Sequence, residues 1–179
     1  MLVRAIAVGV AVMVLAVPVS AQQRGMVEFG GFISSTGFDN SLNLNTTVGG
    51  GGRIGAFLHP RLSVEFEGSG ARASRPLGLS NRSVRIISAR LTAVPVAFDR
   101  ISILLGLGAG HTDTNIGAGA DDQSYGFHGL LGAKFALSDA AAVRLDGIQY
   151  WVGGNKNRSL HLGLSLYRKP ATMSPQQPQ

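Results

Sequence analysis

The sequence predicts an all-β fold, an eight-stranded antiparallel up-and-down transmembrane β-barrel. Three observations lead to this prediction. Apolar residues recur at every second position in segment after segment, short and long connectors alternate, and no long apolar run follows residue 21. Because successive side chains of a strand point to opposite faces, a period of two predicts strands with one apolar and one polar face.

The N-terminal segment has the features of a secretory signal peptide. A basic start at Arg4 precedes the apolar run AIAVGVAVMVLAV, and small residues lead up to Ala21. The run is short for a spanning helix, which needs about 20 residues, so we expect cleavage after Ala21. The predicted division of the chain is a signal peptide at 1–21, an outer-membrane barrel domain at 22–168 and a disordered, Pro- and Gln-rich tail at 169–179.

The composition narrows the class of partner. The chain carries a net charge of +6, contains 25 glycines and no cysteine, and only 15% of its residues are charged. Export makes nucleic acid an unsuitable partner for this basic surface. We therefore expect outer-membrane lipid and the phosphates of lipopolysaccharide as partners, with no cofactor.

The first half of the barrel domain contains four predicted strands. Val27, Phe29 and Ile33 alternate with polar residues and glycines, and the pattern repeats on both sides of a turn at His59-Pro60. The four strands are expected at 27–33, 53–58, 62–67 and 83–98.

The fourth of these segments is irregular. Val84 and Leu91 fall in opposite phases, so we expect a β-bulge near Ile87 and Ser88. Pro95 also lacks the N–H that a ladder hydrogen bond needs.

The second half contains four more predicted strands, at 101–110, 125–137, 141–146 and 159–167. The last of them, SLHLGLSLY, is strictly alternating, with leucines on one face. Its expected role is to pair with the first strand and close the barrel. Short connectors are expected near 59–60, 99–100 and 138–139, and long ones at 34–46, 71–82, 112–123 and 152–158. This alternation of connector length is typical of membrane barrels, whose long loops lie outside and whose termini are periplasmic.

The polar faces favour lipid over water on the outside. A soluble, lipocalin-like barrel remains the alternative, because it has the same alternation with the apolar face inward. Here the polar face is rich in glycine, which suits a narrow lumen, and its four acids match its four bases, so that buried charges can pair. Aromatic residues, among them Tyr150, also gather near strand ends, as in interfacial girdles. The predicted lumen charge network comprises Glu28, Arg53, Glu65, Glu67, Arg90, Lys134, Arg144 and Asp146.

Three stretches carry a family resemblance. GGRIGAFLHPRLSVEFEGS, ISILLGLGAG and AAVRLDGIQY resemble segments of the OmpA-like outer-membrane β-barrel family of Gram-negative bacteria. The resemblance implies an eight-stranded barrel with a polar, charge-paired interior and assembly by the barrel-insertion machinery. Arg53, Glu65, Glu67 and Arg144 match positions where the family commonly carries interior charges.

Candidate sites for chemistry are few, and no catalytic, cofactor-binding or metal site is expected. GLGAGH lacks the βαβ unit of a dinucleotide site, and the histidines are scattered without cysteine. His161 and Ser165 lie about 13 Å apart along one strand, too far for a nucleophile and its base. The best functional pattern is a basic loop, which we expect to bind lipopolysaccharide phosphates. Its arginines are Arg72, Arg75, Arg82 and Arg85.

The expected function is that of a monomeric outer-membrane barrel with a structural or surface-interaction role, a filled polar lumen and no catalysis. A small passive channel or ligand-binding barrel is the alternative. A lipid A-modifying enzyme and the soluble lipocalin-like barrel are further alternatives.

Overall fold

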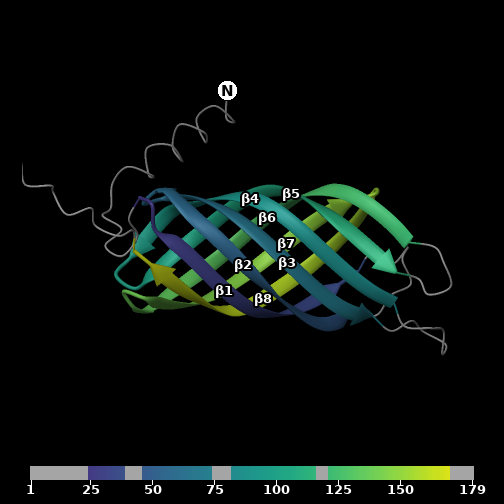
Figure 1. Cartoon of the computed structure of the whole chain (residues 1–179), viewed down its shortest axis with the longest axis horizontal. Helices are drawn as coiled ribbons and strands as arrows, with labels where there is room; N and C mark the ends of the chain where they lie inside the picture. The colour runs from purple at the N-terminus through teal and green to yellow at the C-terminus, as the bar shows by residue number, and fades with distance from the viewer. Residues whose placement is uncertain (1–23, 39–45, 74–81, 116–120, 170–179) are drawn as a thin grey trace, which may run out of the picture.

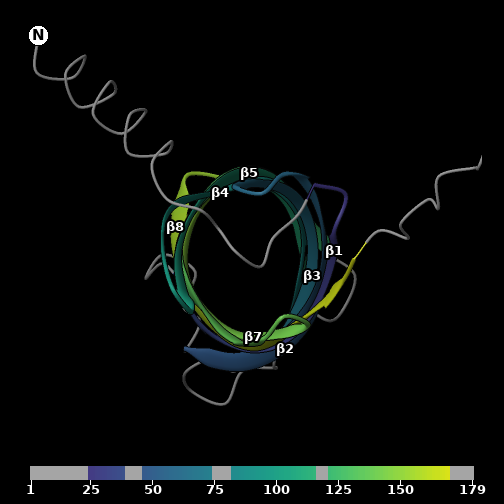
Figure 2. The same cartoon turned by 90° about the vertical axis from the view of Figure 1, so that its left-hand side faces the viewer.

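The computed structural model describes residues 24–38, 46–73, 82–115 and 121–169, which form a closed antiparallel barrel of eight strands (Figure 1). Viewed along its axis the barrel is an oval ring (Figure 2). This confirms the predicted fold class. The strands are β1 (Val27–Gly37), β2 (Thr47–His59), β3 (Leu62–Ala73), β4 (Arg82–Phe98), β5 (Ile101–Asn115), β6 (Asp121–Ser138), β7 (Ala141–Val152) and β8 (Asn155–Arg168). The predicted signal peptide and all of the predicted tail but Lys169 lie outside the described residues.

The last strand closes the barrel on the first. β8 pairs with β1 in one unbroken register, from Val27 opposite Arg168 to Gly37 opposite Arg158. Every strand therefore has two hydrogen-bonded neighbours, and no edge is left to pair with another chain.

The outer wall of the barrel is apolar. The leucines of β8, from Leu160 to Leu166, all point outward and are 46–54% exposed. Exposed large hydrophobic side chains occur on all eight strands, whereas a soluble barrel turns such residues inward. No helix among the described residues has the length and apolar character to cross a membrane.

The interior is only partly polar, so the predicted polar lumen is wrong for part of the barrel. Beside the charged residues described below lies an apolar cluster contributed by β4, β5, β6 and β7. Tyr150 belongs to it and is 3% exposed, so it is not part of an outer aromatic girdle. The cluster consists of Val94, Leu104, Leu130, Ile148, Tyr150 and Val152.

The predicted bulge in β4 is also misplaced. The register of β4 against β5 is regular through Ile87 and Ser88 and shifts between Ala93 and Val96, around Pro95. Pro95 cannot donate to the ladder, so the irregularity falls beside it. The phase change that prompted the prediction arises because Val84 is apolar yet faces the interior, where it is 4% exposed.

The two ends of the barrel differ in their connections. Two-residue turns at 60–61, 99–100 and 139–140 join strands at one end, which we call the turn end. At the other, the loop end, the connection expected at 152–158 is instead a two-residue turn, Gly153-Gly154. Both glycines have positive φ, at 56° and 82°, as a tight type I′ hairpin requires.

A charged residue introduced on the outer wall tests whether that wall lies in hydrocarbon or in water. Leu164→Arg near the middle of β8 should destabilise the barrel in lipid vesicles by about 2–4 kcal/mol, whereas Val48→Arg near the loop end should cost at most about 1 kcal/mol. Urea unfolding of the two variants in lipid vesicles measures both values. Equal, small losses at both positions would mean that the leucine face does not lie in hydrocarbon.

Candidate functional site

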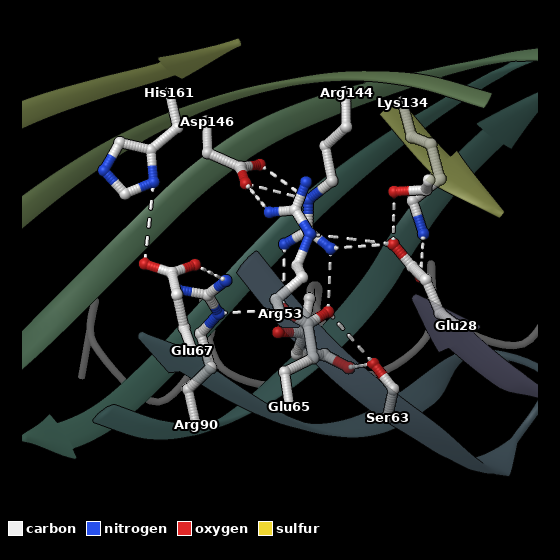
Figure 3. Close-up of polar contacts among 12 residues, drawn as sticks. Glu28, Arg53, Ser63, Glu65, Glu67, Arg90, Lys134, Arg144, Asp146 and His161 are labelled. Atoms are coloured by element: carbon white, nitrogen blue, oxygen red, sulfur yellow. Dashed lines mark hydrogen bonds and ion pairs between the residues drawn. The ribbon is translucent and has the colours of Figure 1, made fainter. Parts of the chain in front are cut away.

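The barrel interior holds one connected network of charged side chains (Figure 3). All eight residues of the predicted lumen set are buried, with at most 5% of each exposed. The structure brings all of them together, and β5 is the only strand besides β8 that supplies no charged member. β5 instead presents Leu104, Gly106 and Gly108 to this interior. Gly108 leaves room for Arg90 and His128 of the neighbouring strands.

Arg144 on β7 is the centre of the network. Its Nη1 and Nη2 donate to the two carboxylate oxygens of Glu65 at 2.9 and 3.0 Å, which is a bidentate pair. Its Nε donates to Asp146 at 2.8 and 2.9 Å, and its Nη1 also reaches Glu28 at 3.4 Å. One guanidinium thus ties β7 to β1 and β3 across the lumen.

Two further ion pairs join β2 to β7 and β6 to β1. Arg53 Nη1 donates to Asp146 Oδ2 at 2.7 Å, and Lys134 Nζ donates to Glu28 Oε2 at 2.7 Å. The Lys134 ammonium also lies 5.5 and 5.2 Å from the ring centroids of Phe57 and Tyr167. Cation–π contacts of this kind contribute most where water is excluded.

Another branch leads from Arg90 toward the loop end. Arg90 Nε donates to Glu65 at 2.8 Å and its Nη2 to Glu67 at 2.6 Å. The other Glu67 oxygen lies 3.6 Å from His161 Nδ1, and His161 Nε2 lies 2.9 Å from Ser159 Oγ. His161 and Ser159 thus extend the polar interior from Glu67 into β8.

This last chain is the nearest approach to a catalytic arrangement among the described residues. Ser159, His161 and Glu67 stand in the order of a nucleophile, base and acid. However, Ser159 is only 5% exposed, and its Oγ is also 2.9 Å from Thr36 Oγ1. The arrangement is a buried polar cluster, in which Glu67 and His161 are not hydrogen-bonded to each other. The pair considered from sequence is separate, since Ser165 donates instead to Glu28 at 2.6 Å.

Sequence reasoning assigned the charged residues to the interior but missed several of their partners. The missed partner of Glu28 is Ser165, which donates a hydrogen bond to it. The missed partners of Lys134 are the rings of Phe57 and Tyr167. The period-two pattern does place all three on the inward face. Which charge each one meets depends on how the strands are staggered around the barrel, and a single-strand pattern does not contain that information.

The predicted basic loop is only partly described. Arg72 is the last outward-facing residue of β3 whose side chain is described, and Arg85 lies on the outer wall of β4. Both side chains are exposed at the loop end. Arg82 begins β4, opposite Ala73, and Arg75 lies outside the described residues. Among the described residues no group of three or more His, Asp or Glu side chains is placed to hold a metal ion.

The comparisons with known proteins agree with this architecture. The family model described as "Outer membrane protein beta-barrel domain" matches residues 7–167. No protein with a curated description matches the chain.

Several solved structures share the fold at low sequence identity. Ail of Yersinia pestis is 15% identical, with 82% of this chain and 100% of that chain covered and a TM-score of 0.59. The N-terminal β-barrel domain of Pseudomonas aeruginosa OprF is 14% identical, with coverages of 82% and 100% and a TM-score of 0.61. The outer membrane protein OprG of Pseudomonas aeruginosa is 13% identical, with coverages of 84% and 99% and a TM-score of 0.63.

Removal of the central guanidinium should destabilise the barrel strongly. Arg144→Met leaves Glu65 and Asp146 buried without their main counter-charge, and we expect a loss of about 3–5 kcal/mol in the free energy of unfolding. The control is Arg100→Met at the exposed turn between β4 and β5, where we expect a change within about 0.5 kcal/mol. A loss below about 1 kcal/mol for Arg144→Met would contradict the central role of this residue.

Proposed function

The chain belongs to the outer membrane protein β-barrel domain family, and on that premise we propose that it is a non-catalytic barrel with a structural and surface-interaction role. The observation that carries the proposal is the filled interior. The eight-membered charge network and the apolar cluster occupy the lumen and leave the outer wall and the loop end as the surfaces for contact.

The filled lumen favours this role over a passive channel. A polar pathway that conducts ions would need a hydrated passage between the two ends, yet ion pairs cross the barrel interior from β7 to β1 and β3. Eight-stranded barrels are narrow enough for side chains to fill them. The barrel would then act through its walls and ends, as a monomer placed by the insertion machinery.

The loop end is the proposed contact with lipopolysaccharide, and in this proposal it faces the cell exterior. Arg72 and Arg85 are exposed there, and arginine binds phosphate oxygens in bidentate fashion. A neighbour in fold offers a parallel, since Ail of Yersinia pestis has been solved in complex with the heparin analogue sucrose octasulfate, at a TM-score of 0.54. A barrel of this architecture can therefore bind a polyanion.

Planar-bilayer recordings test the filled lumen. The folded chain should show no large, stable conductance, because the buried ion pairs must separate before ions can pass. Addition of a folded porin to the same bilayer serves as the positive control. Frequent, long-lived open states of the chain would instead support the small passive channel.

The basic loop end is tested with lipopolysaccharide itself. Arg72→Gln combined with Arg85→Gln should weaken binding by about 2 kcal/mol, or roughly thirtyfold in Kd, at about 1 kcal/mol for each charge. The matched control is Arg100→Gln combined with Arg168→Gln, two exposed arginines at the turn end. Binding that falls equally in both double variants would show a dependence on net charge alone and would contradict the assignment to the loop end.

A further inference from the structure

The outer wall of β7 and β8 contains polar residues close to the loop end. From these residues toward the turn end the same wall is apolar. Gln149 on β7 and Arg158 on β8 face outward as register partners. Immediately toward the turn end on the same wall, the outward positions are Gly147 and Leu160. A glutamine and an arginine at this depth require an explanation, because polar groups facing lipid are costly.

Gln149 is held in place by the strands and in turn holds Arg158. Its Nε2 donates to the carbonyl oxygens of Asn157 and Tyr150 at 2.9 and 3.2 Å. Its Oε1 accepts a hydrogen bond from Arg158 Nε at 3.1 Å. The amide therefore has all of its strong groups occupied, and its orientation is fixed by the backbone.

This contact leaves the two Nη groups of Arg158 available to bind a ligand. With Nε bound to Gln149, the two Nη groups form the free edge of the guanidinium. Among the described residues no carboxylate lies within 4.0 Å of this group, although every interior arginine has such a partner. A pre-oriented guanidinium without a counter-charge is suited to bidentate binding of a phosphate.

An apolar groove of about 1080 Å³ begins beside this arginine. Its lining passes from Leu160 to Gly147, Leu131 and Leu105, which are successive register partners across β8, β7, β6 and β5. Gly147 has no side chain, so the wall is recessed between leucines. The groove therefore crosses the strands and leads from the polar pair at the loop end into the apolar wall.

The single tryptophan of the chain stands at the head of this groove. Trp151 is 46% exposed on the outer wall. Its ring lies against Gly129, where an added Cβ would be 3.6 Å from two of its ring carbons. Indole rings gather at the boundary between headgroups and hydrocarbon, so Trp151 marks the depth at which a headgroup would meet Arg158.

We propose that this wall is a binding site for one lipid A moiety of lipopolysaccharide, separate from the contact at Arg72 and Arg85. A lipid A phosphate binds the two Nη groups of Arg158, and an acyl chain lies in the groove over Gly147. Gln149 is a positioning residue that orients the guanidinium. This inference rests on the proposed function in one respect, namely that the loop end lies in the outer leaflet. The positive charge of Arg158 favours a phosphorylated lipid over a neutral one.

Trp151 fluorescence gives a direct measurement. The full chain, folded in an uncharged detergent, is titrated with lipid A, and we expect a saturable change in the emission of this only tryptophan. Arg158→Gln should raise the Kd at least about tenfold, since a charged hydrogen bond contributes about 1.5–3 kcal/mol. Arg158→Lys keeps the charge but loses the two-pronged guanidinium, so its Kd for lipid A should lie between those of the wild type and Arg158→Gln. Gln149→Leu should weaken binding while leaving the charge unchanged.

The control arms identify the ligand and separate this site from the loop end. Dephosphorylated lipid A, a phospholipid with equal chains and inorganic phosphate alone should each bind at least about tenfold more weakly. The variant Arg72→Gln combined with Arg85→Gln should respond as the wild type does. Heat-modifiability on gels confirms that each variant is folded.

Three results would overturn the site. If folded Arg158→Gln bound lipid A with unchanged affinity, Arg158 would not be the residue that binds the phosphate. Equal binding of the phospholipid or of free phosphate would mean that lipid A is not the occupant. Loss of the Trp151 response in the Arg72 and Arg85 double variant alone would place the lipid at the loop end, which would support the proposed function and contradict this inference.

Discussion

The burial of four acids and four bases inside a closed barrel is the constraint on which the rest of the structure depends. Arg144 alone reaches Glu65, Asp146 and Glu28, so it joins strands that are distant in sequence. A one-residue slip of any strand that carries a network residue would move that charge into the outer wall and the apolar residues of the strand into the lumen. In a membrane both changes are costly, and the network therefore specifies the register as well as filling the interior.

Glycine makes this interior possible. Eight strands enclose little space, and four arginine and lysine side chains share it with the apolar cluster. Gly132 is an example, since a Cβ at this position would overlap the carboxylate of Asp146. Gly30 is similarly close to the Arg53 side chain, where an added Cβ would lie 2.8 Å from Nε. At these two positions the absence of a side chain makes room for a large charged residue in a narrow barrel.

The sequence predicts which face each residue occupies more reliably than which residue it meets. Period-two alternation placed Glu28 and Arg144 in the lumen because that pattern is a property of a single strand. Their contact depends on the stagger of eight strands, which no local pattern contains. The β4 bulge was misplaced because Val84 is an apolar residue in an interior assumed to be polar. Gly153-Gly154 was assigned to a long loop because the polar residues after it were not recognised as the start of β8, although paired glycines are a hairpin signal.

The two faces of the barrel also divide its possible functions. Inside, acids and bases pair with one another across the lumen, so the interior contributes stability and register. Outside, the wall is mostly apolar, so its few polar and charged residues are the informative ones. Arg158 is such an exception, because it carries a charge that no described carboxylate neutralises and is oriented by Gln149 rather than by an acid. An interior arginine is explained by its partners within the chain, whereas for this one we propose a partner from the membrane.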